Sequence, residues 1–271
     1  MRFRSAIFFL WPLLLSVPTA VAQKRVFATV NPNATALNSD ADIYNPATGT
    51  IIPVTGKMSE ARLQFVAVRM NGGKVFIGGG YNNRYLNTAE IFDPATGTFT
   101  STDDMLAARS GAVAALLQGG TVLIAGGYNG TYLSSAEIFD PTTETFTVAG
   151  SLSVARQHAT ATRLSGGKIF IVGGFNGAFL NSSEIYTTST GKFASTAGIM
   201  INRREGHAAT LLSDGRVLIT GGCNNANSAE IKCDKFLSSA EIYNPSTDSY
   251  SGTGSMIAPR INHTASILAD G

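Results

Sequence analysis

One segment of this chain recurs at a nearly fixed interval, and this recurrence constrains the fold more than any other feature. The sequence AEIFDPATGTFT at 89–100 returns with the same apolar, acidic and aromatic positions. Related copies occupy 41–52, 136–147, 183–194 and 240–251. A second element ends in Gly-Gly, and the first glycines of its four copies, 47, 47 and 48 residues apart, are Gly79, Gly126, Gly173 and Gly221. A period of about 40–50 residues indicates one supersecondary unit that is stacked repeatedly.

The fullest copy, residues 109–152, predicts four short strands. They are expected within 109–120, 121–127, 136–140 and 145–150. A Gly-Gly pair joins the first two strands as a tight hairpin, and Pro141 ends the third because proline cannot donate to a strand ladder. No 3.6-residue periodicity persists long enough to favour helices. Four antiparallel strands per repeat are typical of one blade of a β-propeller, so the fold class is all-β.

The repeat resembles the Kelch motif, and in particular the bacterial secreted proteins grouped with galactose-oxidase-like propellers. The resemblance rests on the Gly-Gly pairs and on two aromatic positions per repeat. The first position holds Phe92, Phe139, Tyr186 and Tyr243, and the second holds Phe99, Phe146, Phe193 and Tyr250. Kelch repeats commonly have Trp at the second position, where this chain has Phe or Tyr, with Ile51 in the first copy. The resemblance implies a propeller over nearly all of residues 23–271.

Complete units start near four arginines, and partial units stand at both ends. The four are Arg62, Arg109, Arg156 and Arg204. Residues 260–271 are expected to supply a first strand, residues 25–29 a second strand, and 41–52 the third and fourth. Together these pieces would complete one blade, giving a ring of about five blades without an open sheet edge. The alternative is that the chain is a fragment of a larger ring, since propellers contain about 4–8 blades.

The first 22 residues predict a signal peptide. Arg2 and Arg4 precede an apolar run, and Ala20-Val21-Ala22 provides a small-residue cleavage site. A chain starting at Gln23 would be secreted, periplasmic or held at the cell surface, with no membrane span. An uncleaved N-terminal anchor is the alternative. Without Arg2 and Arg4, 18 basic residues face 18 acidic ones, and this balance argues against a nucleic-acid partner.

The two cysteines, Cys223 and Cys233, both lie in the one repeat that carries an insertion. A close pair in an exported chain favours a disulfide that fastens the inserted loop. Two free buried thiols are the alternative. A metal site is the weaker hypothesis, because no matching group of ligands lies nearby in the sequence.

The loops that follow the second strand of each unit are long and variable, and we expect function there because binding residues concentrate on loops held by a rigid scaffold. Their aromatic residues and neighbouring asparagines suit a neutral polar ligand such as a sugar. The candidate binding residues are Tyr81, Asn82, Arg84, Tyr85, Tyr128, Asn129, Tyr132, Phe175, Asn176 and Phe179. The alternative is that the aromatic residues recur because each blade packs against the next. Arg84, present in one loop alone, and the inserted loop are better candidates for a specific contact.

The three histidines do not define a metal site. His207 and His263 each follow the arginine of their unit by three residues, and His158 follows its arginine by two, which predicts that its side chain points to the other face of the strand. A copper site of the galactose-oxidase-like kind would need His and Tyr ligands and a Tyr joined to a Cys. Those residues cannot be mapped onto this chain, so we expect no metal and no cofactor.

Acidic and basic residues occur in register through the repeats, which predicts structural ion pairs or backbone hydrogen bonds repeated around the ring. The acids are Asp42, Glu90, Glu137, Glu184 and Glu241, and the arginines are Arg62, Arg109, Arg156, Arg204 and Arg260. A glycosidase would need one distinctive carboxylate pair rather than several equivalent ones. Nothing else in the sequence designates a catalytic residue.

The sequence thus favours a secreted, non-enzymatic binding module for a protein or a glycan. An extracellular galactose-oxidase-like or other sugar-modifying enzyme, with its site in the central channel, is the second hypothesis. A purely structural segment of a larger surface protein is the third.

Overall fold

The computed structural model describes residues 25–27, 39–45, 48–225 and 233–268. The expected signal peptide, 1–22, lies outside them. The described residues form short antiparallel strands and two single-turn 3-10 helices, η1 (Asn71–Gly73) and η2 (Ser165–Gly167).

Four sheets of four antiparallel strands match the four complete repeats. The first contains β4 (Val66–Arg69), β5 (Val75–Gly78), β6 (Ala89–Asp93) and β7 (Thr98–Ser101). The second contains β8 (Val113–Leu116), β9 (Val122–Ala125), β10 (Ser135–Asp140) and β11 (Thr145–Ser151). The third contains β12 (Thr160–Arg163), β13 (Lys168–Val172), β14 (Ser183–Thr187) and β15 (Lys192–Ser195). The fourth contains β16 (Ala208–Leu211), β17 (Val217–Thr220), β20 (Ala240–Asn244) and β21 (Ser249–Thr253). The prediction of four strands per repeat is therefore confirmed.

Two smaller sheets complete the described part. The partial N-terminal unit forms β1 (Arg25–Phe27), β2 (Asp42–Asn45) and β3 (Thr50–Pro53), paired in that order. The insertion in the fourth repeat forms a two-stranded ribbon of β18 (Cys223–Asn224) and β19 (Lys235–Phe236).

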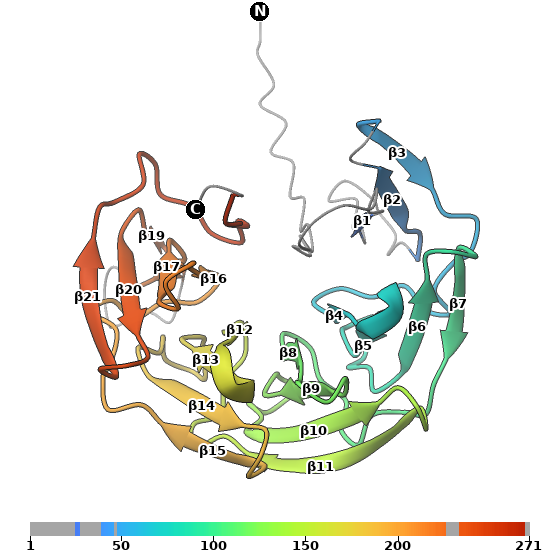
Figure 1. Cartoon of the computed structure of the whole chain (residues 1–271), viewed down its shortest axis with the longest axis horizontal. Helices are drawn as coiled ribbons and strands as arrows, with labels where there is room; N and C mark the ends of the chain where they lie inside the picture. The colour runs from blue at the N-terminus through green and yellow to red at the C-terminus, as the bar shows by residue number, and fades with distance from the viewer. Residues whose placement is uncertain (1–24, 28–38, 46–47, 226–232, 269–271) are drawn as a thin grey trace, which may run out of the picture.

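The sheets stand as blades around a common centre (Figure 1). The first strand of each complete blade, β4, β8, β12 or β16, lies innermost, and the fourth strand lies outermost. The inner strands of neighbouring blades contact one another. This arrangement is a β-propeller, and it places every loop after a second strand on the same face.

The blades trace an open arc rather than a closed ring (Figure 1). Residues 25–27 form β1 and pair with β2 as expected, but residues 260–268 form no strand, so the expected first strand is not found in the described part of 260–271. Instead, Asn262 donates its backbone N–H to the carbonyl of Gly206, at 2.8 Å, beside the fourth blade. No strand pair in the described residues joins the two ends of the arc.

The core lies between the blades. Phe76 of one blade packs against Phe139 of the next, with ring centroids 4.7 Å apart, and Phe170 stacks on Tyr243 at 4.3 Å. The recurring aromatic residue of the third strand therefore fills the space beside the second strand of the preceding blade. Such repeated interfaces bury both faces of the second strands, which explains why β9 is buried along its whole length.

The backbones of neighbouring blades approach closely at the Gly-Gly pairs. Gly126 has a φ of +68°, and a Cβ atom there would lie 2.4 Å from the carbonyl oxygen of Arg156 in the next unit. Gly127 then donates its N–H to the same carbonyl, at 2.8 Å. Both the left-handed backbone and the close approach require glycine.

Candidate functional site

The face that carries the long loops also carries the connections from one blade to the next. Backbone bridges join Leu63 to Tyr81, Ser110 to Tyr128 and Gln157 to Phe175. In each case a residue next to the repeat arginine pairs with the first residue of the loop that follows the second strand. Loops and connections therefore form one continuous surface, which we call the loop face.

Six aromatic rings of the loop face form an unbroken row across three blades. Within each loop the two rings lie 5.0–5.2 Å apart, and between loops Tyr85 lies 5.5 Å from Tyr128 and Tyr132 lies 5.7 Å from Phe175. Tyr81 is exposed at one end of the row, and Phe179 is buried at the other. The rings thus pack between blades, while those in the middle are partly exposed to solvent.

The asparagines next to this row shape the loops. Asn129 Oδ1 accepts a hydrogen bond from Thr131 Oγ1 at 3.2 Å, and Asn176 Oδ1 accepts one from the backbone N–H of Ala178 at 3.3 Å. The equivalent Asn82 closes its turn through a backbone hydrogen bond to the carbonyl of Arg84, at 2.9 Å. Arg84 itself is more than half exposed and forms an ion pair with Glu60.

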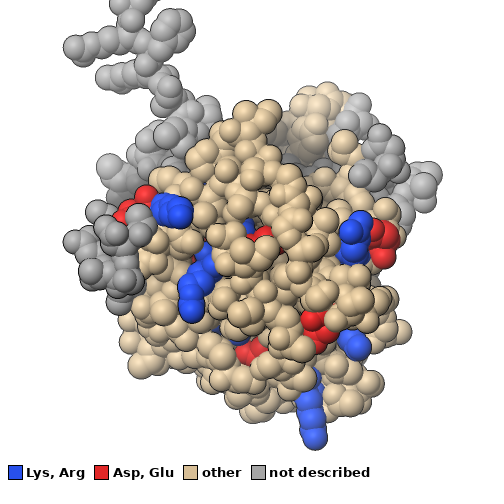
Figure 2. Space-filling view, turned by 90° about the vertical axis from the view of Figure 1, so that its left-hand side faces the viewer, with Lys and Arg blue, Asp and Glu red and all other residues tan. Residues whose placement is uncertain are grey.

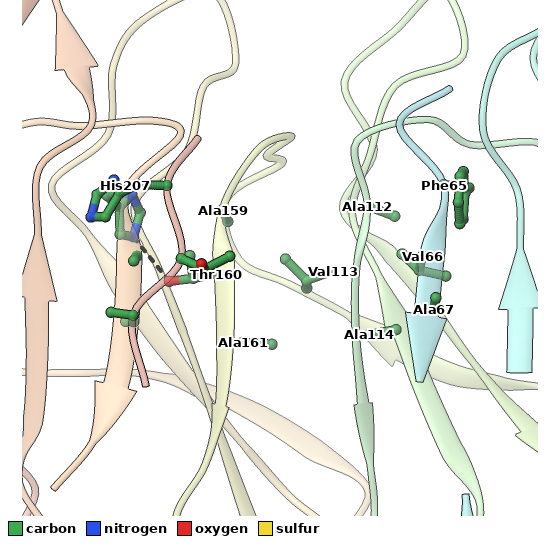
Figure 3. A pocket seen from close by; sticks show the side chains of 15 residues that line it. Phe65, Val66, Ala67, Ala112, Val113, Ala114, Ala159, Thr160, Ala161 and His207 are labelled. Atoms are coloured by element: carbon green, nitrogen blue, oxygen red, sulfur yellow. Dashed lines mark hydrogen bonds between the residues drawn. The ribbon is translucent and has the colours of Figure 1, made fainter. Parts of the chain in front are cut away.

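The inner strands line a channel of about 330 Å³ at the centre of the arc (Figure 3). Its wall is mostly alanine and valine, with Phe65 on one side and His207 on the other. His207 Nε2 lies 2.9 Å from Thr160 Oγ1, and His263 Nε2 lies 2.8 Å from Thr220 Oγ1. Burial, reinforced by the positive charge of Arg204, lowers the pKa of His207 to about 3, so this imidazole is neutral near pH 7.

A polar pocket of about 160 Å³ lies beside the channel, where the connections between blades meet, and sequence reasoning missed it. Gln64, His158 and Asn262 line it and occupy the same position in their repeats, two residues after the arginine. All three have a left-handed backbone, with φ between 52° and 53°. Glycine takes this position in the other two repeats, again with positive φ.

The signal for this pocket was present in the sequence as a repeat position that alternates between glycine and large polar residues. A non-glycine residue with positive φ is uncommon and costs about 1 kcal/mol or more, and such residues cluster at functional sites. The direction expected for His158, away from the face of His207, agrees with its place in the pocket while His207 lines the channel.

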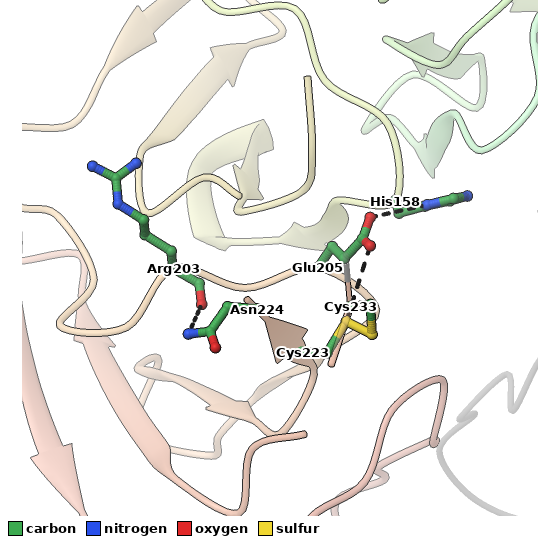
Figure 4. Close-up of a disulfide and its surroundings, with 6 residues drawn as sticks. All are labelled: His158, Arg203, Glu205, Cys223, Asn224 and Cys233. Carbon is green, nitrogen blue, oxygen red and sulfur yellow. Dashed lines mark hydrogen bonds and ion pairs between the residues drawn. A yellow bond between two sulfur atoms is a disulfide. The ribbon is translucent and has the colours of Figure 1, made fainter. Parts of the chain in front are cut away.

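Glu205 completes the polar pocket and lies against the disulfide (Figure 4). Its Oε2 is 3.2 Å from His158 Nδ1, and its Oε1 is 3.9 Å from the sulfur of Cys223. The Cys223–Cys233 disulfide is present, as the sequence predicted. Among the described residues, Glu205 and the two cysteines are the one group of three potential metal donors within 4.8 Å of one another.

Four of the five expected ion pairs are present and buried between the loop face and the sheets. The nitrogen–oxygen distances are 2.9 Å in Arg62–Glu90, 2.7 Å in Arg109–Glu137, 3.0 Å in Arg156–Glu184 and 2.5 Å in Arg204–Glu241. Each arginine also donates to two backbone carbonyls of its own blade, such as those of Gly126 and Ser135 for Arg109. Burial lowers the pKa of these arginines, and the facing glutamate opposes the shift.

Arg260 and Asp42, the remaining members of these two repeat positions, form no ion pair with each other in the described residues. The arc is open where these two residues would have to meet, and the structure leaves Arg260 exposed (Figure 1). Elsewhere on the surface, the flank on the left of Figure 1 carries scattered charges of both signs without a continuous patch (Figure 2).

Comparison with known proteins agrees with the architecture. The Kelch motif matches four segments that span more than half of the chain: 62–106, 109–153, 159–197 and 206–257. Among solved structures, that titled "Structure of YjhT" is similar with a TM-score of 0.73 at 12% sequence identity, over 86% of this chain and 82% of that one. No curated protein sequence matches. The four motif matches, one to each complete blade, show that the chain belongs to the Kelch repeat family.

Proposed function

We propose that the chain is an exported, non-enzymatic binding module whose loop face holds a protein or a glycan. Kelch propellers commonly mediate protein binding, and this family membership supports an interaction role. The observation that carries the proposal is the polar pocket in which Gln64, His158 and Asn262 all adopt a left-handed backbone.

The chemistry of the pocket suits a polar ligand group. Two amides, one imidazole and the Glu205 carboxylate provide both hydrogen-bond donors and acceptors within about 160 Å³. That volume is smaller than a typical drug-sized site, so it fits one ring of a sugar or one protein side chain better than a whole small molecule. The aromatic row adds partly exposed ring faces on the same side of the molecule.

Binding to an oligosaccharide panel and to surface-protein fragments tests the proposal. His158→Ala and Tyr81→Ala should each weaken binding about tenfold, equivalent to roughly 1.4 kcal/mol. Val148→Ala is a suitable control, because Val148 is exposed on the outermost strand of its blade. Whether the wild-type protein binds an oligosaccharide or a protein fragment shows which class of ligand it recognises. Unchanged binding in both variants would contradict the proposed site.

A sugar-modifying enzyme with its site in the channel is the second candidate, and the channel volume of about 330 Å³ favours it because small-molecule sites begin at this size. Turnover of a simple sugar, with or without added copper, that is lost in His207→Phe would replace the binding proposal. Binding to the loop face without turnover would support the binding proposal over the enzyme candidate.

Export is tested by the N-terminus of the protein recovered from its native host. Cleavage after Ala22 should leave Gln23 as the first residue, which mass spectrometry detects. No helix in the described residues is long and apolar enough to cross a membrane. A retained Met1 would support the membrane-anchor alternative.

A further inference from the structure

The disulfide is positioned by the ribbon that replaces the usual loop in the fourth repeat. Cys223 occupies the place that Tyr81, Tyr128 and Phe175 hold in the other loops, directly after Gly-Gly. It pairs with Phe236 across the ribbon, as Tyr128 pairs with Tyr132. Thus the repeat that lacks an aromatic residue at the start of this loop has a sulfur atom there.

The fold brings an acid and a histidine to this sulfur from distant parts of the sequence. Glu205 lies between His158 and the disulfide (Figure 4), and its carboxylate reaches both, at 3.2 Å and 3.9 Å. The Glu205 side chain is 15% exposed, and Cys223 is fully buried. The donor atoms of Glu205, Cys223 and Cys233 all lie within 4.8 Å of one another.

We propose that reduction of the Cys223–Cys233 disulfide creates a binding site for a zinc-class divalent cation, with both thiolates and the Glu205 carboxylate as ligands. Thiolate and carboxylate are both established zinc ligands, at about 2.3 Å and 2.0–2.2 Å. Two sulfur ligands of a tetrahedral zinc lie about 3.8 Å apart, so small side-chain movements bring the three donors into place.

His158 acts as a positioning residue in this site. Its imidazole holds Glu205 through the oxygen that does not face the sulfur, and such outer partners of metal ligands orient the ligand and strengthen binding 10–100-fold. Glu205 and Cys233 also line the polar pocket, so a water molecule or a ligand atom in the pocket can take the fourth coordination position.

The reaction that opens the site is thiol–disulfide exchange. An external dithiol gives two electrons and two protons to the disulfide, which becomes two thiols while the dithiol becomes its own cyclic disulfide. Zinc binding then releases the two thiol protons to solvent, leaving two thiolates on the metal. In the oxidised protein the sulfurs are bonded to each other and cannot serve as thiolate ligands, so the site exists only after reduction.

The experiment compares the oxidised protein with protein that has been reduced and freed of reductant under anaerobic conditions. Zn²⁺ is titrated against a chromogenic chelator, and Co²⁺ is added separately to detect thiolate-to-metal charge-transfer absorption. The reduced protein should bind one Zn²⁺ per chain and show the Co²⁺–thiolate band. The oxidised protein should show neither.

Variants separate this site from simple chelation by two thiols. Glu205→Gln and His158→Ala should each weaken zinc binding by the reduced protein at least tenfold, with thermal unfolding checked for each. Glu60→Gln is the matched control, because Glu60 is an acid of the loop face that pairs with Arg84 instead. Unchanged affinity in Glu205→Gln, less than one Zn²⁺ per reduced chain, or unfolding of the protein on reduction would each overturn the proposal.

Discussion

At the residue scale, buried charge recurs at one arginine and one glutamate per complete blade. Glu137 accepts hydrogen bonds from two nitrogens of Arg109, at 2.7 and 3.0 Å, and from the backbone N–H of Leu106, at 2.7 Å. Burying two charges is expensive, so such a pair adds less to stability than its geometry suggests, whereas removing one partner is severely destabilising. We infer that these pairs fix how each blade connects to the next.

Glu137→Gln should therefore lower the free energy of unfolding by about 3 kcal/mol while leaving ligand binding intact. The exposed Glu144, changed to Gln, is the control and should shift it by less than about 0.5 kcal/mol. Urea unfolding measures both variants. Loss of binding at unchanged stability would show that Glu137 serves recognition instead.

A second prediction concerns pH. The folded protein keeps His207 neutral, with a pKa of about 3, whereas the imidazole of the unfolded chain takes up a proton below pH 6.5. The unfolded state then binds more protons, so stability is lost as the pH falls through this window, by up to about 1.4 kcal/mol per pH unit.

His207→Phe should remove this dependence, and the first repeat already accommodates Phe65 at the same position. Between pH 7 and pH 5, the free energy of unfolding of the wild-type protein should fall by about 2 kcal/mol more than that of the variant. Urea unfolding at both pH values measures the difference. If the wild-type protein and the variant lose the same free energy of unfolding, the pKa of His207 in the folded protein is not lowered and the prediction is wrong.

At the scale of elements, neighbouring blades meet at the Gly-Gly pairs that follow the second strands. These pairs end the second strand of each blade and let the backbone of the following repeat approach directly. The aromatic residue of the third strand then fills the space between blades. A blade is therefore stable mainly through its neighbours, as in other repeat proteins.

Gly126→Ala should destabilise the protein by more than about 3 kcal/mol, because the new Cβ atom would lie 2.4 Å from the carbonyl oxygen of Arg156. Gly166→Ala provides a matched control: its φ of +69° is nearly that of Gly126, but no atom lies within 4 Å of the position that a Cβ would take. Gly166→Ala should therefore lower the free energy of unfolding only by the cost of the left-handed backbone, about 1–2 kcal/mol. Thermal or urea unfolding that gives similar losses for both would rule out the close contact as the cause.

At the scale of the whole molecule, the blades form an open arc in which the last repeat arginine stands apart from the others. Arg62, Arg109, Arg156 and Arg204 are buried and paired with glutamates, whereas Arg260 is exposed. In a closed ring Arg260 would meet Asp42 at the equivalent position of the first unit. Whether Arg260 is buried and paired therefore indicates whether the arc closes into a ring.

Arg260→Ala should change the free energy of unfolding by less than about 0.5 kcal/mol, while Arg204→Ala should lower it by about 3–5 kcal/mol because Glu241 would stay buried without its partner. Equilibrium unfolding in urea compares the two variants. Similar losses for both would indicate that the ring closes in solution and that a fifth pair forms.

The sequence alone determined the blade. Its period, its turn glycines and its strand composition are local properties, and each complete repeat shows the predicted four strands because backbone preference and hydrophobic pattern agree there. The in-register arginines and glutamates followed from the same repetition, whereas the disulfide followed from two cysteines lying close together in the one inserted loop. The aromatic residues of the loops were also found, although their arrangement as one continuous row was not.

Only the tertiary structure decided what meets at the polar pocket and whether the ring closes. Gln64, His158, Glu205 and Asn262 are spread over four repeats, and nothing in their spacing shows that the curvature of the arc brings them together. From the sequence, a metal site at the two cysteines was the weaker hypothesis because no matching group of ligands lies near them along the chain. Glu205 and His158 are distant from Cys223 and Cys233 in the sequence, and the fold brings them together (Figure 4). Contacts between residues far apart in the chain depend on how each blade rotates relative to the last, and that rotation is set by packing between blades rather than by any one repeat.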